Sequence, residues 1–315
     1  MKIIEMNTIN LSLNSNVMGE VLKLDSVAEF NAIRGQETLH PLVSVLDQSK
    51  SQPVAVSRFY SGLYIVFLKE VKCGELRYGR NQYDYQEGTL LFIAPGQILG
   101  TDENVEMIQP KGWVLAFHPD LIRGTSLGRN IKDYNFFSYD ITEALHVSDR
   151  ERQVVVECFN KIHFELEHAI DKHSRTLIIS NIELFLKYCI RFYDRQFITR
   201  DNVHKDILVR FENLLGEYFQ STKPQTSGFP SVSYCAGQLN LSSNYFGDLV
   251  KKETGRSAQE YIQEKMIDIA KEKVLDISKP ISEIAYEIGF KYPAHFSRFF
   301  KQRVGHSPNE YRSLS

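Results

Sequence analysis

The sequence predicts an α+β protein built in two parts: a β-rich first half that ends in two long helices, and an all-α second half. Three observations predict this division. Short apolar runs separated by turn residues fill positions 59 to 118. Apolar residues then recur with helical period from position 148 onward. The last third of the chain repeats itself, which is typical of a duplicated supersecondary unit.

The strands of the first half are expected within residues 20–135, as an antiparallel sandwich or barrel. They are rich in branched and aromatic residues, and short, regular turns separate them. The clearest runs cover residues 63–68, 89–94 and 111–118, and weaker ones cover 40–46, 73–79 and 82–85, with a short helix at 29–35.

Two long amphipathic helices are expected at residues 148–171 and 175–197. Their apolar side chains recur at helical spacing, from Val154 to Ile170 in the first helix and from Leu177 to Tyr193 in the second. Two such stripes contain more apolar surface than one flank of a small barrel needs. One interpretation is that both stripes simply cover the barrel.

The repeat consists of two segments that end at Tyr261 and Tyr311. Phe, Lys, Gly, Ser, Glu and Tyr recur in them at a constant offset of 50 residues. Ala236 and Ala285 are 49 residues apart, so the second copy carries one extra residue at its turn. Each copy has the pattern of a helix-turn-helix unit, whose second helix has apolar residues at i, i+3 and i+4. These inward residues are Phe246, Leu249 and Val250 in the first copy and Phe296, Phe299 and Phe300 in the second.

Capping residues mark the ends of these helices. Ser242 is in the N-cap position of the longer helix of the first copy, and Pro293 suits the first turn of its counterpart. Gly255 and Gly289 are typical helix-terminating residues. Between the copies, residues 258–277 predict one helix, roughly 30 Å long at 1.5 Å per residue. Because successive major-groove faces of DNA lie about 34 Å apart, this helix is long enough to hold two polar helix faces near one DNA turn apart.

Residues 232–312 resemble the DNA-binding domain of the AraC/XylS family of bacterial transcription regulators. The resemblance is carried by three segments of the second copy, Ile284-Ala285-Tyr286-Glu287-Ile288-Gly289-Phe290, Phe296-Ser297-Arg298-Phe299-Phe300-Lys301 and Ser307-Pro308-Asn309-Glu310-Tyr311-Arg312. It implies a sequence-specific DNA-binding transcription regulator that contacts double-stranded DNA and RNA polymerase. Activation is the usual effect in the family, and repression stays an alternative.

The resemblance also implies an organisation of the whole chain. The segment at 88–96 resembles the corner of cupin barrels, which implies a cupin-like sensor and dimerisation domain over residues 1–198. Residues 199–205 are then the linker, and residues 206–315 the DNA-binding domain, starting with a helix at 207–219. Family members often dimerise through helices placed like those at 148–197, which implies a homodimer.

The family pattern implies which residues face DNA. Those on the first reading helix, which begins at residue 243, are Ser243, Asn244 and Asp248, with Gly247 between them offering no side chain. Those on the second reading helix, which begins at residue 293, are Ala294, His295, Ser297 and Arg298. The candidates for phosphate contacts are Lys251, Lys252, Lys291, Lys301 and Gln302.

Three of these residues have specific chemical roles to consider. The Asn244 amide can bond an adenine edge through two atoms. Asp248 can accept a hydrogen bond from a cytosine amino group, or it can pair with Lys251 or Lys252 one turn on, which we favour. Arg298 can grip a guanine through O6 and N7, which we favour, or hold a phosphate without reading sequence.

Composition excludes several other classes of protein. The whole chain has a net charge of −2, and residues 205–315 carry 15 Lys and Arg against 13 Asp and Glu, so DNA affinity must come from placed contacts. The four cysteines, Cys73, Cys158, Cys189 and Cys235, lie far apart, which predicts free thiols in a reducing cytoplasm. We expect no signal peptide, because the first residues contain no apolar run typical of one, and no stretch of the sequence is long enough to span a membrane.

Catalytic and metal-binding patterns are absent from the sequence. Only His40 and His118 fall in the barrel region and they form no His-x-His pair, so we expect no metal and no cofactor. The sequence has no phosphate loop, no H-E-x-x-H and no Ser/His/Asp set, so we expect no enzyme. Glu260 and Glu310 are related by the repeat, which favours capping or ion pairing over acid/base chemistry.

A small-molecule effector is expected in the barrel. Its pocket is predicted from four aromatic residues, Tyr64, Phe92, Trp113 and Phe117, although aromatic residues in a barrel also serve as core. Two alternatives stay open. The first half can bind only protein, as an assembly platform, or it can be a barrel enzyme fused to a DNA reader.

Overall fold

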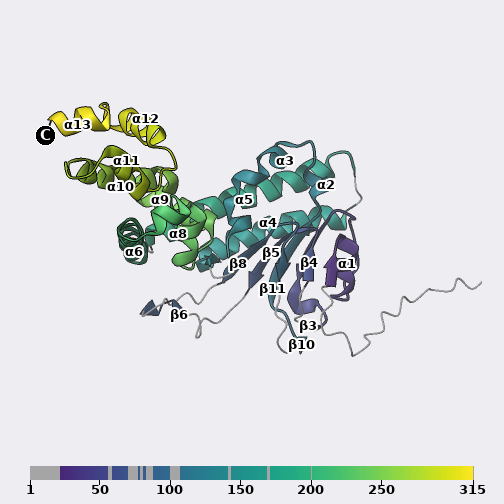
Figure 1. The fold of residues 1–315 in the computed structure, drawn as a ribbon. Coiled ribbons are helices and arrows are strands. Elements are labelled where there is room, and N and C mark those ends of the chain that lie inside the picture. The colour runs from purple at the N-terminus through teal and green to yellow at the C-terminus, as the bar shows by residue number, and fades with distance from the viewer. Residues whose placement is uncertain are drawn as a thin grey trace, which may run out of the picture.

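The computed structural model describes residues 22–55, 59–69, 77–78, 81–82, 88–99, 107–140, 143–168, 171–199 and 201–314. It confirms the predicted mixture of sheet and helix with a helical C-terminal region. A sheet covered by two long helices forms the N-terminal half, and a further set of helices forms the C-terminal half (Figure 1). The strands expected at 73–79 and 82–85 lie largely outside the described residues.

The described strands form one larger sheet and three small ones. The larger sheet is antiparallel, in the order β12-β8-β5-β11-β2. The small sheets are β1-β4-β9, β10-β3 and β6-β7. The strands are β1 (Leu22–Leu24), β2 (Val43–Asp47), β3 (Val54–Ala55), β4 (Phe59–Ser61), β5 (Tyr64–Lys69), β6 (Arg77–Tyr78), β7 (Asn81–Gln82), β8 (Thr89–Ile93), β9 (Ile98–Leu99), β10 (Met107–Ile108), β11 (Gly112–Phe117) and β12 (Leu145–His146).

The described strands do not form a closed barrel. In the part of the chain that the structure describes, β2 and β12 are the two edges of the larger sheet, and no strand pairing joins that sheet to the smaller ones. The described strands therefore do not show the cupin-like barrel expected from the sequence, because strand pairing does not continue around a ring.

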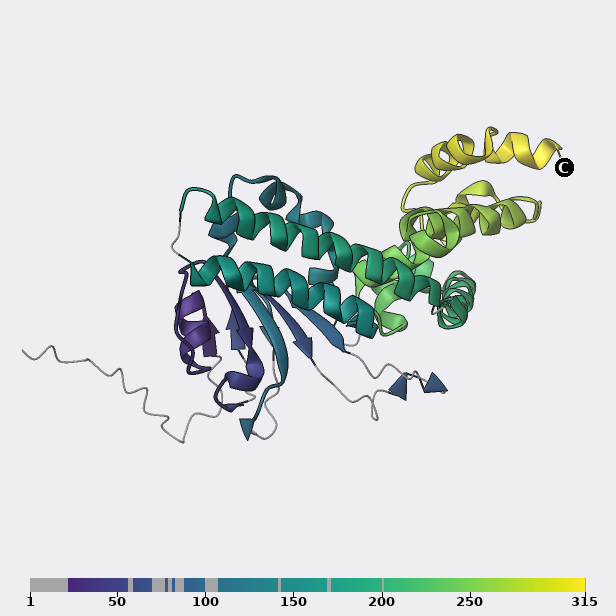
Figure 2. The same ribbon diagram turned by 180° about the vertical axis from the view of Figure 1, so that it is seen from behind.

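The larger sheet buries a different set of side chains on each face. Strand residues alternate between the faces, so Ile65, Val114 and Ala116 pack with β1 and α1 (Val27–Ala32) in one apolar cluster. Val66, Leu115 and their same-face neighbours join the core beneath α4 (Asp149–Glu167) and α5 (Ser174–Thr199). Figure 2 shows these two long helices lying across the sheet. A short segment with α2 (Pro119–Ile122), α3 (Ser126–Asn130) and η3 (Asn135–Ser138) connects β11 to β12.

The two long helices are confirmed, and the stripe that covers the sheet is buried. Val155, Phe159 and Ile162 of α4 are fully enclosed. Ser148 caps α4 through a capping box with Glu151, which satisfies free first-turn amides. On α5, two residues of the predicted apolar pattern, Leu177 and Ile190, are 46% and 43% exposed.

The C-terminal half contains the two predicted helix-turn-helix units. They are α8–α9 and α11–α12, joined by α10, with α6 before them and α13 after them. Their bounds are α6 (Asp201–Gln220), α7 (Lys223–Ser227), α8 (Val232–Gln238), α9 (Ser243–Thr254), α10 (Ala258–Val274), α11 (Ile281–Ile288), α12 (Pro293–Val304) and α13 (Pro308–Leu314). The sequence placed residues 199–205 in a linker. Residues 201–205 are instead helical and form the start of α6.

The joining helix α10 is shorter than expected. It has 17 residues, which gives about 25 Å at the usual rise. Leu275 is its C-cap, and Ile277, expected within this helix, lies beyond it and is 83% exposed. Ile262, Met266, Ala270 and Val274 are buried along one side of the helix, and Ile269 is half-buried.

The segment between α6 and α8 forms a support for the second unit. Its helix α7 packs against α11. The Tyr218 hydroxyl of α6 donates to the Gly228 carbonyl at 2.9 Å, and Phe229 contacts Phe290 with ring centroids 4.7 Å apart. This segment therefore connects α6 to the turn of the second unit.

The packing of this segment against α11 requires glycine at position 289. Its φ is +107°, and an added Cβ would lie 2.8 Å from the Pro224 carbonyl oxygen. We therefore expect Gly289→Ala to lower the free energy of unfolding by about 1–3 kcal/mol, measured by urea denaturation. Gly216→Ala in α6 is the control, since a Cβ there meets open space and alanine favours the helix. Equal stability of the Gly289→Ala variant and the wild type would contradict this interpretation of the turn.

Candidate nucleic-acid interface

The first reading helix, α9, begins and ends where the sequence predicts, and the second, α12, begins where it predicts. The Ser242 side chain accepts a hydrogen bond from the Tyr245 amide at 3.2 Å, and Gly255 closes α9 in the left-handed conformation. Pro293 stands in the first turn of α12, and Gly305 closes that helix in the same way. Local sequence therefore determines the extent of both helices.

The face of α12 that the sequence assigned to DNA is open. Ala294, His295 and Arg298 are exposed, and Ser297 is half-buried. The phosphate candidates Lys291, Lys301 and Gln302 are also exposed. On the opposite face, Phe296 and Phe300 are fully buried in the core of the unit.

The second unit is held together by polar contacts around the end of α10. Glu287 of α11 accepts from Lys273 Nζ at 2.7 Å and also pairs with Lys279. The Arg312 guanidinium donates to the carbonyls of Val274 at 2.7 Å and of Lys279 at 3.0 Å. The terminal motif of the sequence thus fastens α13 to the end of the joining helix.

The two repeated glutamates are capping residues, which confirms the favoured interpretation. Glu260 accepts from the Ser257 amide at 2.8 Å and Glu310 from the Ser307 amide at 2.6 Å. These hydrogen bonds lower the pKa of both carboxyls, so each stays ionised at the N-terminus of its helix.

The first reading helix differs from the second because part of its polar face contacts the N-terminal half. Ser243 and Asn244 are exposed, whereas Asp248 is half-buried. Both Asp248 carboxylate oxygens lie 3.1 Å from Asn135 Nδ2, and the Tyr139 hydroxyl donates to one of them at 2.5 Å.

The N-cap of the same helix is bound by a buried carboxylate. Glu143 accepts from the Ser242 amide at 2.7 Å and from the Ser242 hydroxyl at 2.5 Å. Glu143 itself is 3% exposed. At the other end of the helix, Lys252 pairs with Asp194 of α5 at 2.8 Å.

Aromatic side chains fill the space between these polar contacts. Tyr245, on the first turn of α9, is buried against Tyr139 and Phe197, with ring centroids 5.3 Å apart in each case. Burial and the neighbouring Asp248 raise the pKa of the Tyr139 phenol, so it remains a hydrogen-bond donor at neutral pH.

The ion pair that the sequence favoured for Asp248 is wrong. In the part of the chain that the structure describes, its partners are Asn135 and Tyr139, and Lys252 pairs with Asp194 instead. The i, i+4 spacing allowed the predicted pair, but tertiary packing brings a closer donor to Asp248. No local pattern of the sequence marks Asn135, Tyr139 or Glu143 as partners of α9.

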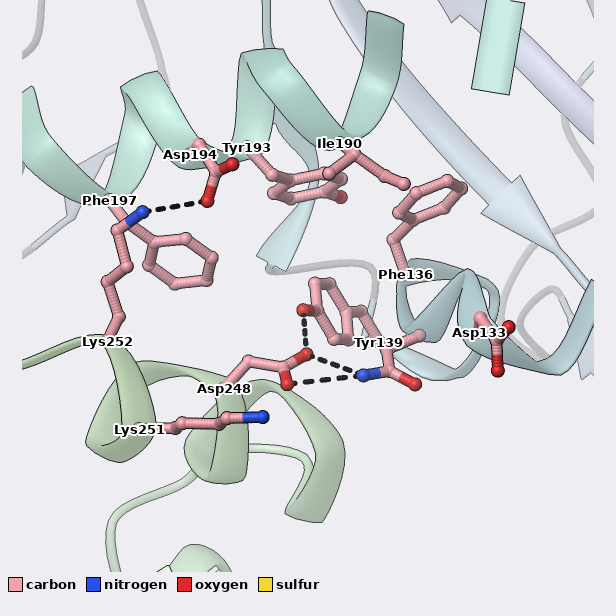
Figure 3. A pocket seen from close by; sticks show the side chains of 11 residues that line it. Asp133, Phe136, Tyr139, Ile190, Tyr193, Asp194, Phe197, Asp248, Lys251 and Lys252 are labelled. Atoms are coloured by element: carbon pink, nitrogen blue, oxygen red, sulfur yellow. Dashed lines mark hydrogen bonds and ion pairs between the residues drawn. The ribbon is translucent and has the colours of Figure 1, made fainter. Parts of the chain in front are cut away.

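A pocket of about 410 Å³ lies between the two halves. Figure 3 shows aromatic rings along one side and Lys251 and Lys252 of α9 along the other. It is lined by Asp133, Asn135, Phe136, Tyr139, Ile190, Tyr193, Asp194, Phe197, Asp248, Lys251 and Lys252.

The four residues expected to contact an effector do not line this pocket. Phe92 and Phe117 are buried on the helix-covered face of the sheet, with Tyr64 and Trp113 packed against the same core. Tyr64 stacks on Phe117 with centroids 5.0 Å apart. Phe92 contacts Phe136, a pocket residue, at 4.4 Å. Their role as effector contacts stays a prediction.

The part of the chain that the structure describes contains no group of three or more His, Cys, Asp or Glu side chains that could hold a metal ion. His118 caps α2, and His40 accepts from the Leu42 amide. Cys158, Cys189 and Cys235 are free and buried, and Cys73 lies outside the described residues. None of the described helices combines the length and apolar character that a membrane crossing requires.

Comparisons with known proteins agree with this geometry. The helix-turn-helix domain family matches residues 235–313. The probable transcriptional regulator LumQ of Photobacterium leiognathi is 26% identical over 46% of this chain and 54% of its own. The HTH-type transcriptional regulator YfiF of Bacillus subtilis is 31% identical over 47% of this chain and 45% of its own. The chain thus spans about half the length of these curated relatives.

Among solved structures, the C-terminal domain of the response regulator AraT from Geobacillus stearothermophilus is 28% identical, with a TM-score of 0.31. It covers 35% of this chain and 85% of its own. The paired units define a double helix-turn-helix protein. Residues 235–313 therefore contain a helix-turn-helix domain of the AraC type, as the sequence predicts.

The free energy of unfolding is expected to depend on pH through Glu287 of α11. Hydrogen bonds from Lys273 and Lys279 lower the pKa of its carboxyl below the ordinary 4.5. Such a group stabilises the fold above its unfolded-state pKa, and the contribution is lost as pH falls through the folded-state pKa. Urea unfolding should therefore show Glu287→Gln less stable than the wild type near pH 7, with the difference shrinking below about pH 4.

Exposed Glu272 of α10 provides the control for this pH series. Glu272→Gln should unfold like the wild type at every pH, since no ion pair is formed by that side chain in the described structure. A stability difference for Glu287→Gln that does not change with pH would refute the electrostatic explanation.

Proposed function

We propose that this protein is a sequence-specific DNA-binding transcription regulator that reads double-stranded DNA with α9 and α12. The observation that carries the proposal is the pair of helix-turn-helix units on one joining helix, each with a polar face on its second helix. The regulators among its relatives support the same function. Activation through contact with RNA polymerase is the effect we favour, by family resemblance.

The shape of the C-terminal half supports DNA binding. Helix α10 packs against both α9 and α12, so the two reading helices are held by one rigid element about 25 Å long. Two helices held in this way suit neighbouring major-groove faces of one duplex. The exposed lysines Lys251, Lys291 and Lys301 supply phosphate contacts, which makes binding dependent on salt.

The assigned base contacts are tested by two substitutions. Asn244→Ala and Arg298→Ala should each cost about 1–3 kcal/mol of preference for the target site over random DNA, because each removes a bidentate contact with a base edge. The target is obtained by selection from a random duplex library with the wild-type protein, and affinities are measured by fluorescence anisotropy at fixed salt.

Two matched controls accompany these variants. Asn309→Ala changes an exposed asparagine of α13, and Arg303→Ala changes an arginine of α12 that bonds Gln263 of α10. Both should keep the preference for the selected site. Unchanged preference in both Asn244→Ala and Arg298→Ala would remove the assigned readout.

A homodimer through α5 is the second part of the proposal. Leu177 and Leu184 lie seven residues apart on one face of α5 and are 46% and 40% exposed, although the opposite stripe is buried. Exposed leucines at this spacing suit a helix–helix interface between two copies. In this proposal one stripe of the long helices covers the sheet and another faces a partner.

The dimer interface predicts a change of oligomeric state. Leu177→Glu combined with Leu184→Glu should raise the dimer dissociation constant at least tenfold, because charged side chains would replace apolar contacts. Sedimentation velocity across a concentration series measures this. The control is Ile277→Glu, an exposed apolar residue in the other half. A dimer unaffected by the double substitution would place the interface elsewhere.

Control by a small molecule is the third part of the proposal. The pocket between the halves, with its aromatic wall and two lysines, has a volume typical of ligand sites. A ligand at 100 times its Kd should add about 2.7 kcal/mol of stability, so a screen of thermal unfolding separates effector control from an N-terminal half that binds only protein. A separate turnover assay that detects a product would favour the alternative of an enzyme fused to a DNA reader.

A further inference from the structure

Residues 221–229, which we name the α7 segment, touch both helix-turn-helix units. On one side, Lys223 Nζ donates to the Tyr234 hydroxyl of α8 at 3.2 Å. On the other side, α7 packs against α11, and Phe229 contacts Phe290 in the turn that leads to α12. The α7 segment therefore lies where the two units meet, next to the start of the second reading helix.

One side of the α7 segment is anchored and the other is open to solvent. Pro224 is buried, and its carbonyl oxygen lies 2.8 Å from the position that a Cβ on Gly289 would take. The Gly228 carbonyl carbon lies 3.3 Å from the same position. Because the backbone is held this closely, the exposed polar side chains of the segment have a fixed origin. These side chains are Lys223, Gln225, Thr226 and Ser227.

The sequence around the α7 segment contains no carboxylate. From residue 218 to residue 247 there is no Asp or Glu, although the whole chain contains 39. Residues 288 to 309, which include the second reading helix, also lack both. Phosphate oxygens accept hydrogen bonds from lysine, hydroxyl and amide groups, whereas a carboxylate nearby would repel them. The composition of the α7 segment therefore suits a surface that lies against phosphates.

A duplex that seats both reading helices presents its backbone at the junction of the two units. Neighbouring major-groove faces on one side of B-DNA lie one helical turn apart. The minor groove lies between them, bordered by two phosphate strands. The α7 segment joins the first unit to the turn of the second, so it is placed at the same junction as these strands.

We propose that the α7 segment is a third DNA contact, which binds the phosphate backbone between the two major-groove faces. Lys223 supplies a charged donor and Gln225 a neutral one, and neither reads a base. The contact adds affinity and fixes the spacing of the two units on the duplex. This inference rests on the proposed function, because it extends the surface with which the same protein binds DNA.

Two substitutions test the contact without changing the anchored side of the segment. Lys223→Gln removes a positive charge, and Gln225→Glu adds a negative charge with little change of shape. Each should weaken binding to the selected duplex and to random DNA by the same factor, about fivefold, so the preference is unchanged. For Lys223→Gln, the slope of log affinity against log salt should also become shallower by about one. Fluorescence anisotropy of the full-length proteins across a salt series measures both effects.

The matched controls carry the same chemical changes in the N-terminal half. Lys172 and Gln153 are exposed there, and Lys172→Gln and Gln153→Glu should bind DNA like the wild type. Urea unfolding of all four variants should give the wild-type free energy of unfolding, because each change is at an exposed side chain. Equal stability with weaker binding separates a DNA contact from a structural support.

A second measurement locates the contact on the duplex. Hydroxyl-radical footprinting with the wild type should show protected sugars in the minor groove between the two major-groove regions. Gln225→Glu should lose this protection, and Gln153→Glu should keep it.

The outcomes separate this contact from the proposed function. Site-specific binding whose affinity and footprint are the same in the wild type, Lys223→Gln and Gln225→Glu overturns the third contact and leaves the proposed function intact. A wild-type protein that selects no sequence from the random library overturns the proposed function, and this inference with it.

Discussion

The packing of α10 is the constraint on which the C-terminal half depends. Ile262, Met266, Ala270 and Val274 are buried along one side of this helix, against helices of both units. Burying the isoleucine, methionine and valine side chains stabilises the arrangement by roughly 1.5–3 kcal/mol each. The two reading helices therefore have one relative orientation, and a duplex has to fit that orientation.

The ends of α10 are fixed by different chemistry. At its start, Ser257 and Glu260 form a capping box. At its end, Arg312 and Glu287 bind the turn that leads into α11. Because these groups are far from the polar faces of α9 and α12, the scaffold and the reading surface can change independently. This separation suits a protein in which one frame carries different recognition residues.

The contact between the halves is polar at its edge and aromatic in its middle. Phe92, Phe136, Tyr193, Tyr139 and Tyr245 follow one another, with each successive pair of ring centroids 4.4 to 5.5 Å apart. The rings connect the core of the sheet to the first turn of α9. A change in the packing of the N-terminal half therefore reaches the first reading helix through side chains in direct contact, while α12 lies outside this path.

The sequence by itself determined the helices of the C-terminal half and their reading faces, because capping residues and apolar spacing are local signals that need no partner. Ser242, Gly255 and Pro293 each act within one turn of the chain. Local signals were weaker elsewhere: the sheet proved open in its described part, α10 ended before Ile277, and Leu177 lay outside the buried stripe. Only the tertiary structure decided which partner Asp248 and Ser242 take, since Asn135 and Glu143 are about a hundred residues away along the chain. Contacts at that separation depend on how the two halves pack, and a single sequence contains no periodic pattern that reports it.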